Sequence, residues 1–147
     1  MKRTRVIGCG NPYMGNDGAG VAAVERLKKL FPKADAIDGG TGGIGLLGDM
    51  DGYERIIIID AMTGIGRKKG EIKVFSDTPP YTPSQISLHD VGVSGVVEAA
   101  KTLIPGTEVI TVGIEVESIK EYSKELDPEV EEGIENICTI VIKILEE

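Results

Sequence analysis

The sequence predicts an α/β fold: a three-layer sandwich whose mainly parallel sheet has roughly five strands and carries an antiparallel edge strand. Three observations support this. Short β-branched runs alternate along the chain with longer amphipathic segments of helical period. Ile56–Ile59 are four consecutive isoleucines, which is typical of a central strand buried on both faces. Glu71–Phe75 alternates apolar and polar residues, which indicates a half-buried edge strand.

The first unit of the chain is a strand, a glycine-rich turn and a helix. We expect the strand over Arg5–Cys9, followed by a sharp turn at Gly10. Asn16 and Asp17 are favourable N-cap residues for a helix that starts near Gly18. The inner face of this helix is predicted to comprise Val21, Val24, Leu27 and Phe31.

The second unit leads to the centre of the sheet. Ala34–Asp38 is predicted to be a short strand, and the loop 39–43 that follows it is rich in glycine and flexible. A short helix begins at Ile44–Leu47, and Arg55–Asp60 is the third strand, ending in an acid.

The third unit contains the edge strand Glu71–Phe75, which we expect to be antiparallel with Ile72 and Val74 pointing inward. The loop 76–91 is long and contains three prolines, and loops of such length in compact domains are often functional. Asp90 is a suitable cap for the next helix. The inner face of that helix is predicted to comprise Val93, Val96, Val97, Ala100, Leu103 and Ile104.

The last unit begins with a β-branched strand over Glu108–Ile114. The segment 115–126 is polar and is predicted to be irregular. Asp127 and Pro128 then start the final helix as its cap and first-turn proline. Its buried stripe is predicted to comprise Val130, Ile134, Ile137, Cys138, Val141, Ile144 and Leu145.

The composition restricts the class of protein. The 147 residues suit a single domain over residues 1–147, and we expect a monomer. The net charge of -8 repels phosphate backbones, so we expect no nucleic-acid partner. No stretch approaches the ~18 apolar residues that span a bilayer, so we expect no membrane partner. Cys9 and Cys138 show neither disulfide-type nor metal-type spacing, which indicates reduced thiols and a cytoplasmic protein.

Three possible metal ligands are predicted to meet at one edge of the sheet. Asp17 follows the first strand, Asp60 ends the third, and His89, the only histidine, lies just before a helix. In a parallel sheet these positions share the carboxyl edge, where ligands bind. Two carboxylates and one imidazole suit a first-row divalent metal and leave coordination positions for water or a substrate.

Each of these residues also has a purely structural interpretation. Asp17 could only cap a helix, Asp60 could only cap the following turn, and a single loop histidine is often inert. Asp38, at the same edge, could orient a ligand, bind substrate, or only form the turn before Gly39. The residues alone leave these alternatives open.

The same regions resemble a known family. Gly8–Asn11 and Met14–Gly20 are similar to the opening motif of the NiFe-hydrogenase maturation endopeptidases. Asp38–Thr41, Ile58–Ala61 and Ser87–Asp90 resemble three later motifs of that family, in matching order and spacing. Four dispersed motifs in register are much more specific than any single one, and together they span nearly the whole chain.

This resemblance implies a peptidase that removes a short C-terminal extension from the precursor of a hydrogenase large subunit after nickel insertion. Nickel, supplied by the substrate, would be recognised by Asp17, Asp60 and His89. Asn16 stands where the family has its first acid. For the chemistry, nickel could polarise the scissile carbonyl or activate a water, or Asp17 or Asp38 could be the general base, and the sequence does not choose.

Two other functions compete with this interpretation. A non-cleaving nickel-binding or chaperone module for hydrogenase precursor would use the same three ligands. Gly8–Pro12 also resembles the opening of bacterial peptidyl-tRNA hydrolases, but those enzymes place a catalytic histidine shortly afterwards, and the acidic surface suits tRNA badly. The chain has no His-Glu-x-x-His motif and no convincing serine or cysteine triad.

Overall fold

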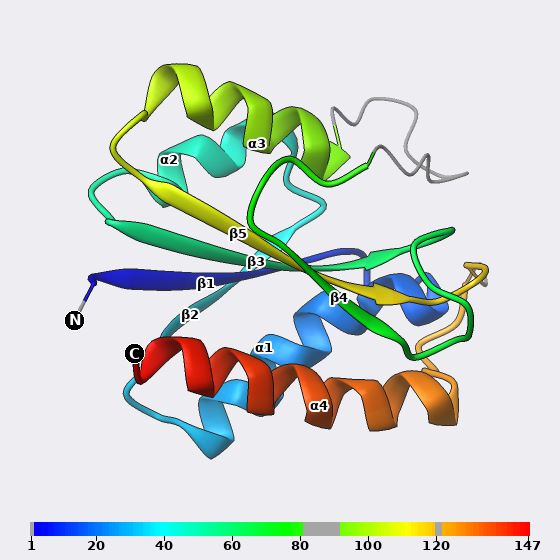
Figure 1. Cartoon of the computed structure of the whole chain (residues 1–147). Helices are drawn as coiled ribbons and strands as arrows, with labels where there is room; N and C mark the ends of the chain where they lie inside the picture. The colour runs from blue at the N-terminus through cyan, green and yellow to red at the C-terminus, as the bar shows by residue number, and fades with distance from the viewer. Residues whose placement is uncertain (1, 81–91, 120–121) are drawn as a thin grey trace.

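The computed structural model describes residues 2–80, 92–119 and 122–147, and it confirms the predicted α/β fold (Figure 1). The strands are β1 (Thr4–Cys9), β2 (Asp35–Gly40), β3 (Arg55–Met62), β4 (Ile72–Phe75) and β5 (Glu108–Glu115). The α-helices are α1 (Ala19–Leu30), α2 (Leu46–Met50), α3 (Gly92–Leu103) and α4 (Pro128–Leu145), and 3-10 turns cover Gly15–Gly18 and Gly43–Gly45.

The five strands form one sheet in the order β2-β1-β3-β5-β4. β1 pairs in parallel with β2 and β3, and β3 pairs in parallel with β5. β4 is antiparallel to β5, as expected for the edge strand. The chain leaves β1 for β2 on one side and then returns to β3 on the other. The strand order therefore reverses between β1 and β3, and open α/β sheets bind ligands at such a reversal.

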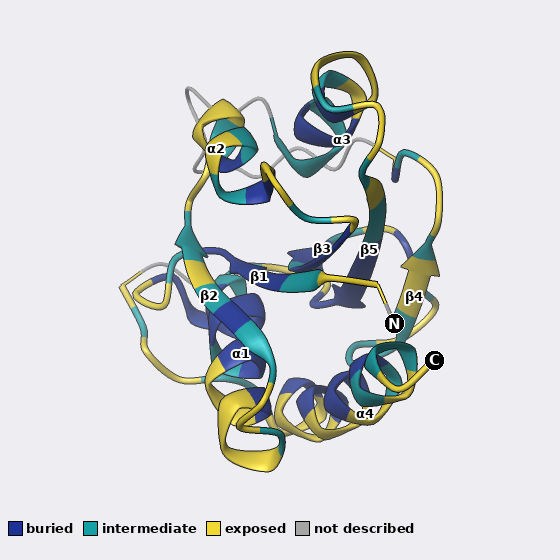
Figure 2. Cartoon of the chain, turned by 90° about the vertical axis from the view of Figure 1, so that its left-hand side faces the viewer, coloured by how far each residue is buried: buried dark blue, intermediate teal, exposed yellow. Residues whose placement is uncertain are grey.

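Helices cover both faces of the sheet. α1 and α4 lie together on one face, and α2 and α3 lie together on the other (Figures 1 and 2). Ile57 and Ile59 belong to the core under α1 and α4, whereas Ile56 and Ile58 belong to the core under α2 and α3. All four isoleucines are fully buried, which confirms that β3 is a central strand packed on both faces.

Two side chains expected inside are exposed. Val74 is 48% exposed, because β4 is a four-residue edge strand and the helices cover it less fully than the central strands. Leu103 is 64% exposed, because it is the last residue of α3 and lies at the end of the packed face. The proposed cap Asp90 lies outside the described residues.

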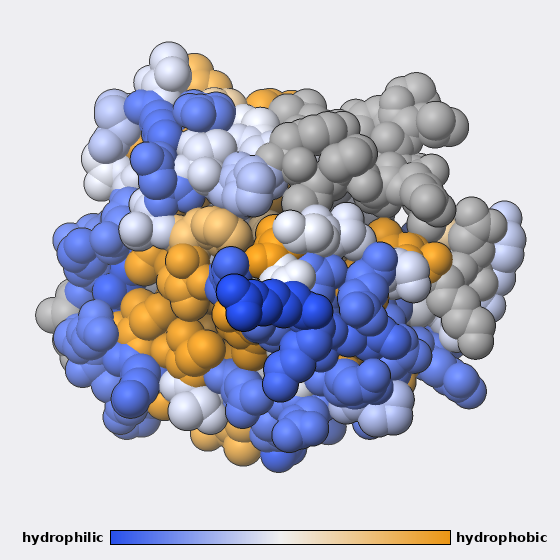
Figure 3. All heavy atoms as spheres, turned by 45° about the vertical axis from the view of Figure 1, so that its right-hand side comes forward, coloured by the Kyte–Doolittle hydropathy of each residue, from blue (hydrophilic) through white to orange (hydrophobic). Residues whose placement is uncertain are grey.

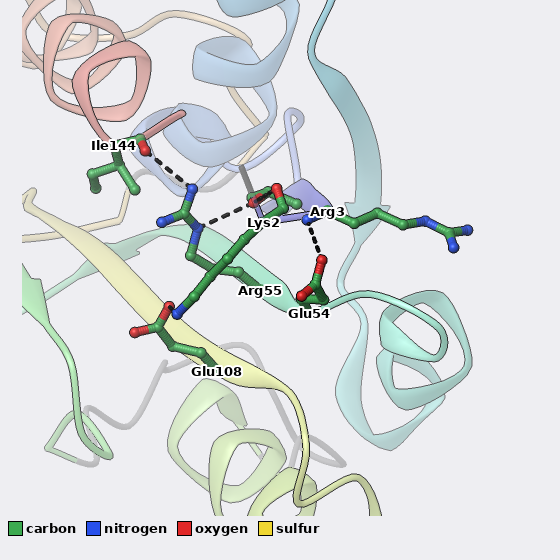
Figure 4. Close-up of polar contacts among 7 residues, drawn as sticks. Lys2, Arg3, Glu54, Arg55, Glu108 and Ile144 are labelled. Carbon is green, nitrogen blue, oxygen red and sulfur yellow. Dashed lines mark hydrogen bonds and ion pairs between the residues drawn. The ribbon is translucent and has the colours of Figure 1, made fainter. Parts of the chain in front are cut away.

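A buried arginine joins the amino end of the sheet to the last turn of α4 (Figure 4). Arg55 is 6% exposed; its Nε donates to Thr4 Oγ1 at 3.1 Å, and its Nη2 donates to the carbonyl oxygen of Ile144 at 3.0 Å. The guanidinium thereby places a positive charge at the carboxyl end of the helix, where the helix dipole favours cations. The backbone N of Arg3 donates to Glu54 at 2.9 Å close by.

Hydrophilic residues dominate the surface in Figure 3 and surround a smaller hydrophobic area, in keeping with the net charge of -8. Cys9 and Cys138 are both buried and form no disulfide, in keeping with the predicted reduced thiols. Within the part of the chain that the structure describes, no helix is both long and apolar enough to cross a bilayer.

Candidate functional site

Two glycines allow α1 to touch the carboxyl ends of the central strands. A Cβ at Gly8 would lie 2.3 Å from the carbonyl oxygen of Gly20. A Cβ at Gly20 would lie 2.4 Å from the carbonyl oxygens of Cys9 and Ile59. Real Cβ contacts are never this short, so the backbone of α1 approaches β1 and β3 at a distance that only glycine permits. This contact fixes the turn between β1 and α1 above the edge where the strand order reverses.

Asp17 lies in the 3-10 turn that precedes α1, and it is half-buried. Its Oδ2 accepts a hydrogen bond from the backbone N of Asn11 at 2.9 Å, which closes the turn on itself. Gly10 has φ of 133°, and a Cβ there would lie 1.9 Å from the carbonyl oxygen of Asp17. The prediction that Asn16 and Asp17 cap α1 is wrong. The N-cap residue is Gly18, and no side chain caps the helix. The side chains of Asn16 and Asp17 form other hydrogen bonds instead.

Asp60 and Asp38 leave the sheet on opposite faces. Asp60 lies on β3 one residue beyond the pair Gly8–Ile59, so it stands beside the end of β1. Asp60 lies two residues after Ile58 and therefore shares its face of the sheet, which is the one covered by α2 and α3. Asp38 lies two residues after Ala36 and therefore shares its face, and Ala36 belongs to the core under α1. The Oδ1 of Asp38 accepts the backbone N–H of Gly40 at 2.7 Å, as expected for a turn former.

Asp17, Asp60 and Asp38 all lie at the carboxyl edge, as predicted, but with different surroundings. Asp17 and Asp60 are half-buried on either side of the strand-order reversal, whereas Asp38 is exposed on β2. His89 lies outside the described residues. Among the residues that are described, no three His, Cys, Asp or Glu side chains are grouped so as to hold a metal ion. Of the three carboxylates at this edge, Asp17 and Asp60 flank the strand-order reversal, and such a hard-oxygen pair fits a divalent metal only with further ligands.

Comparisons with known proteins identify the family of the chain. Residues 21–144 match the family model described as hydrogenase maturation protease. The chain is 32% identical, over 99% of its length, to the hydrogenase 2 maturation protease of Escherichia coli (strain K12), and the match covers 92% of that protein. The chain belongs to the hydrogenase maturation protease family. It is therefore an endopeptidase that acts in hydrogenase maturation.

Solved structures of hydrogenase maturation proteases share the fold. The hydrogenase maturating endopeptidase HybD from Escherichia coli superposes with a TM-score of 0.80 at 32% identity, covering 98% of this chain and 92% of that one. The maturation protease HybD from Thermococcus kodakarensis gives 0.74 at 27% identity, covering 97% and 98%. Asp38, Asp60 and His89 fall within the range that the family model matches, and Asp17 lies just before it.

In this maturation protease, Asn16 has a role that sequence reasoning missed. Its side chain is 4% exposed and pairs reciprocally with Asp127 at the start of α4. Asn16 Nδ2 donates to Asp127 Oδ2 at 2.8 Å, and the backbone N of Asp127 donates to Asn16 Oδ1 at 2.9 Å. Lys69 lies 3.0 Å from the same Asp127 oxygen. A hollow of about 560 Å³ beside this contact is lined by Lys124, Glu125, Leu126, Asp127, Pro128 and Glu131.

Glu115 was also missed, because its polarity favoured a loop. It is the last residue of β5 and is 2% exposed. Its carboxylate accepts the backbone N–H groups of Ile65 at 2.7 Å, Gly66 at 2.9 Å and Glu117 at 2.8 Å. Burial alone would raise the pKa of Glu115, but these bonds outweigh it and hold the pKa below its ordinary value. The carboxylate thus fastens the loop 64–70 to the carboxyl edge of the sheet.

Proposed function

We propose that this protease removes the C-terminal extension from the nickel-loaded precursor of a NiFe-hydrogenase large subunit, and that Asp17, Asp60 and His89 recognise the nickel of that substrate. The observation that carries the proposal is the position of Asp17 and Asp60. Both are half-buried carboxylates at the carboxyl ends of the adjacent strands β1 and β3, where the strand order reverses. Such a crevice is where open α/β sheets bind ligands.

The third ligand is supported by chain position. α3 begins at Gly92, three residues after His89, and it covers the face from which Asp60 extends. Imidazole and carboxylate are both suitable donors for nickel. Three protein donors leave coordination positions for the substrate's own ligands, which suits a metal that arrives bound to the precursor.

The general base is also proposed from geometry. A carboxylate that activates the attacking water has to reach the same space as the metal. Asp17 lies at the strand-order reversal, whereas Asp38 leaves the sheet on the face opposite to Asp60. This arrangement favours Asp17 over Asp38. The metal of the substrate would polarise the scissile carbonyl or lower the pKa of the water.

The test is cleavage of purified precursor, followed by intact-mass measurement. We expect the protease to shorten the nickel-loaded precursor by its C-terminal tail and to leave nickel-free precursor intact. Treating the protease with a chelator, and then removing the chelator, should leave the activity unchanged, because the nickel belongs to the substrate.

The matched variants are Asp60→Asn and Asp51→Asn. Asp51 is an exposed acid at the end of α2, so its amide variant should cleave at the parental rate. Asp60→Asn keeps the side-chain shape but loses the charge, so it should fold and fail to cleave. Efficient cleavage of nickel-free precursor, or an active Asp60→Asn protein, would refute the proposal.

A further inference from the structure

Contacts between distant parts of the chain hold the turn that carries Asp17. Asn16 is the residue immediately before it, and its buried carboxamide both donates to and accepts from Asp127. A carboxamide can do both, whereas an ionised carboxylate accepts hydrogen bonds but donates none. An acid at position 16 would instead face the carboxylate of Asp127 within hydrogen-bonding distance.

The backbone just before Asn16 is tied to the segment that leads into α4. Gly15 N donates to the carbonyl oxygen of Ser123 at 2.6 Å, and Met14 forms a parallel bridge with Ser123. Lys69 supplies a cation to Asp127, and this hydrogen bond raises the pKa of Lys69, so the lysine remains charged. Asp127 therefore connects the loop 64–70, the start of α4 and the turn before α1.

We propose that Asn16 and Asp127 are positioning residues for the peptidase reaction, whose reciprocal hydrogen bonds set the orientation of the Asp17 carboxylate. The proposal rests on the function proposed above in one respect, that Asp17 contacts the reacting substrate. Asp17 belongs to the same four-residue turn as Asn16, so a shift of Asn16 moves Asp17 with it. A misplacement of about 1 Å at a reacting group can cost roughly 100-fold in rate.

A carboxyl–carboxamide swap tests the pair. In Asn16→Asp, two carboxylates oppose each other and the donor is lost. In the double variant Asn16→Asp/Asp127→Asn, the donor is restored from the other side, and the backbone N of residue 127 still has an acceptor. Asn136→Asp is the matched control, because it makes the same substitution on the exposed face of α4.

Cleavage of nickel-loaded precursor is the first measurement. At a temperature where the parent and all three variants are fully folded by melting curves, we expect Asn16→Asp to lose about 100-fold in kcat with little change in KM. The double variant should recover most of that rate, and Asn136→Asp should equal the parent. A folded Asn16→Asp protein with parental kcat, or a double variant as slow as the single one, would overturn the proposal.

Amide hydrogen exchange gives a second, independent measurement. The N–H groups of Asn11 and Gly15 bond to Asp17 Oδ2 and to Ser123, so they report on the turn directly. We expect both to exchange faster in Asn16→Asp and at the parental rate in the double variant, with the middle of α1 unchanged. If the parent cuts no precursor, the proposed function fails; unchanged exchange at these two amides overturns the positioning role in either case.

Discussion

Replacing Gly20 by alanine should separate the effect of helix propensity from the effect of the contact between α1 and the sheet. The new Cβ would lie 2.4 Å from two carbonyl oxygens, those of Cys9 and Ile59, and 2.9 Å from the backbone N of Cys9. These are backbone atoms of two paired strands and cannot rotate away. Overpacking typically lowers folding stability by about 1–3 kcal/mol, and with three such contacts we expect this variant to lose about 3 kcal/mol. Propensity alone would stabilise it by about 1 kcal/mol.

Thermal and urea unfolding measure this difference. At roughly 2–4 °C per kcal/mol for a chain of this size, Tm should fall by about 6–12 °C. Gly48→Ala in α2 is the control, because a Cβ there meets nothing within 4 Å, and it should keep or raise Tm. Precursor cleavage should fall in the Gly20 variant alone, since the turn that carries Asp17 precedes this contact. A Gly20→Ala protein with the Tm of the parent or higher would refute the reasoning.

Three further outcomes follow from single side chains. Asp17→Asn should keep an acceptor for the Asn11 N–H and therefore nearly the parental Tm, whereas Asp17→Ala should lose about 1 kcal/mol of folding stability. Neither variant should cleave precursor. An active Asp17→Asn protein would remove Asp17 from the site. The folded-state pKa of Glu115 is depressed, so its stabilising contribution is present above its ordinary value of 4.5 and is lost as pH falls through the lower folded value. Urea midpoints between pH 7 and pH 3 should therefore fall less steeply for Glu115→Gln, and identical slopes would contradict this. Burial raises the pKa of the Cys138 thiol to about 11, so iodoacetamide at pH 8 should modify it only in urea, as intact mass will show.

The layers and the types of element follow from patterns that are local in the sequence. The isoleucine run of β3 and the alternation of β4 each depend on residues a few positions apart, and both strands form as predicted. The inner residues of α4 repeat at helical spacing, and the predicted Val130, Ile137 and Val141 are fully buried. Such patterns are informative because one burial pattern extends over a whole element.

The errors concern side chains whose partners are far away in sequence. Asn16 has the chemistry of an N-cap, but its carboxamide bonds to Asp127, and that distant pairing outweighs the local capping preference. Glu115 is polar and was assigned to a loop, yet loop N–H groups satisfy its carboxylate inside the fold. Local sequence patterns predict neither contact, because each contact depends on where the fold places a segment that is distant in sequence. At the site, sequence order alone placed Asp17, Asp60 and Asp38 at the carboxyl edge, but it did not show that Asp60 and Asp38 extend from opposite faces of the sheet.

The pairing of Asn16 with Asp127 also has a consequence for the order of events during synthesis. The two residues are 111 positions apart, so a ribosome adding roughly 5–20 residues per second needs roughly 6–22 s to reach the second after the first. Throughout that interval the turn with Asp17 has no tether to the start of α4, even where β1 and β3 have already paired. The hydrogen bonds that hold this turn against α4 can therefore form only after residue 127 has been synthesised.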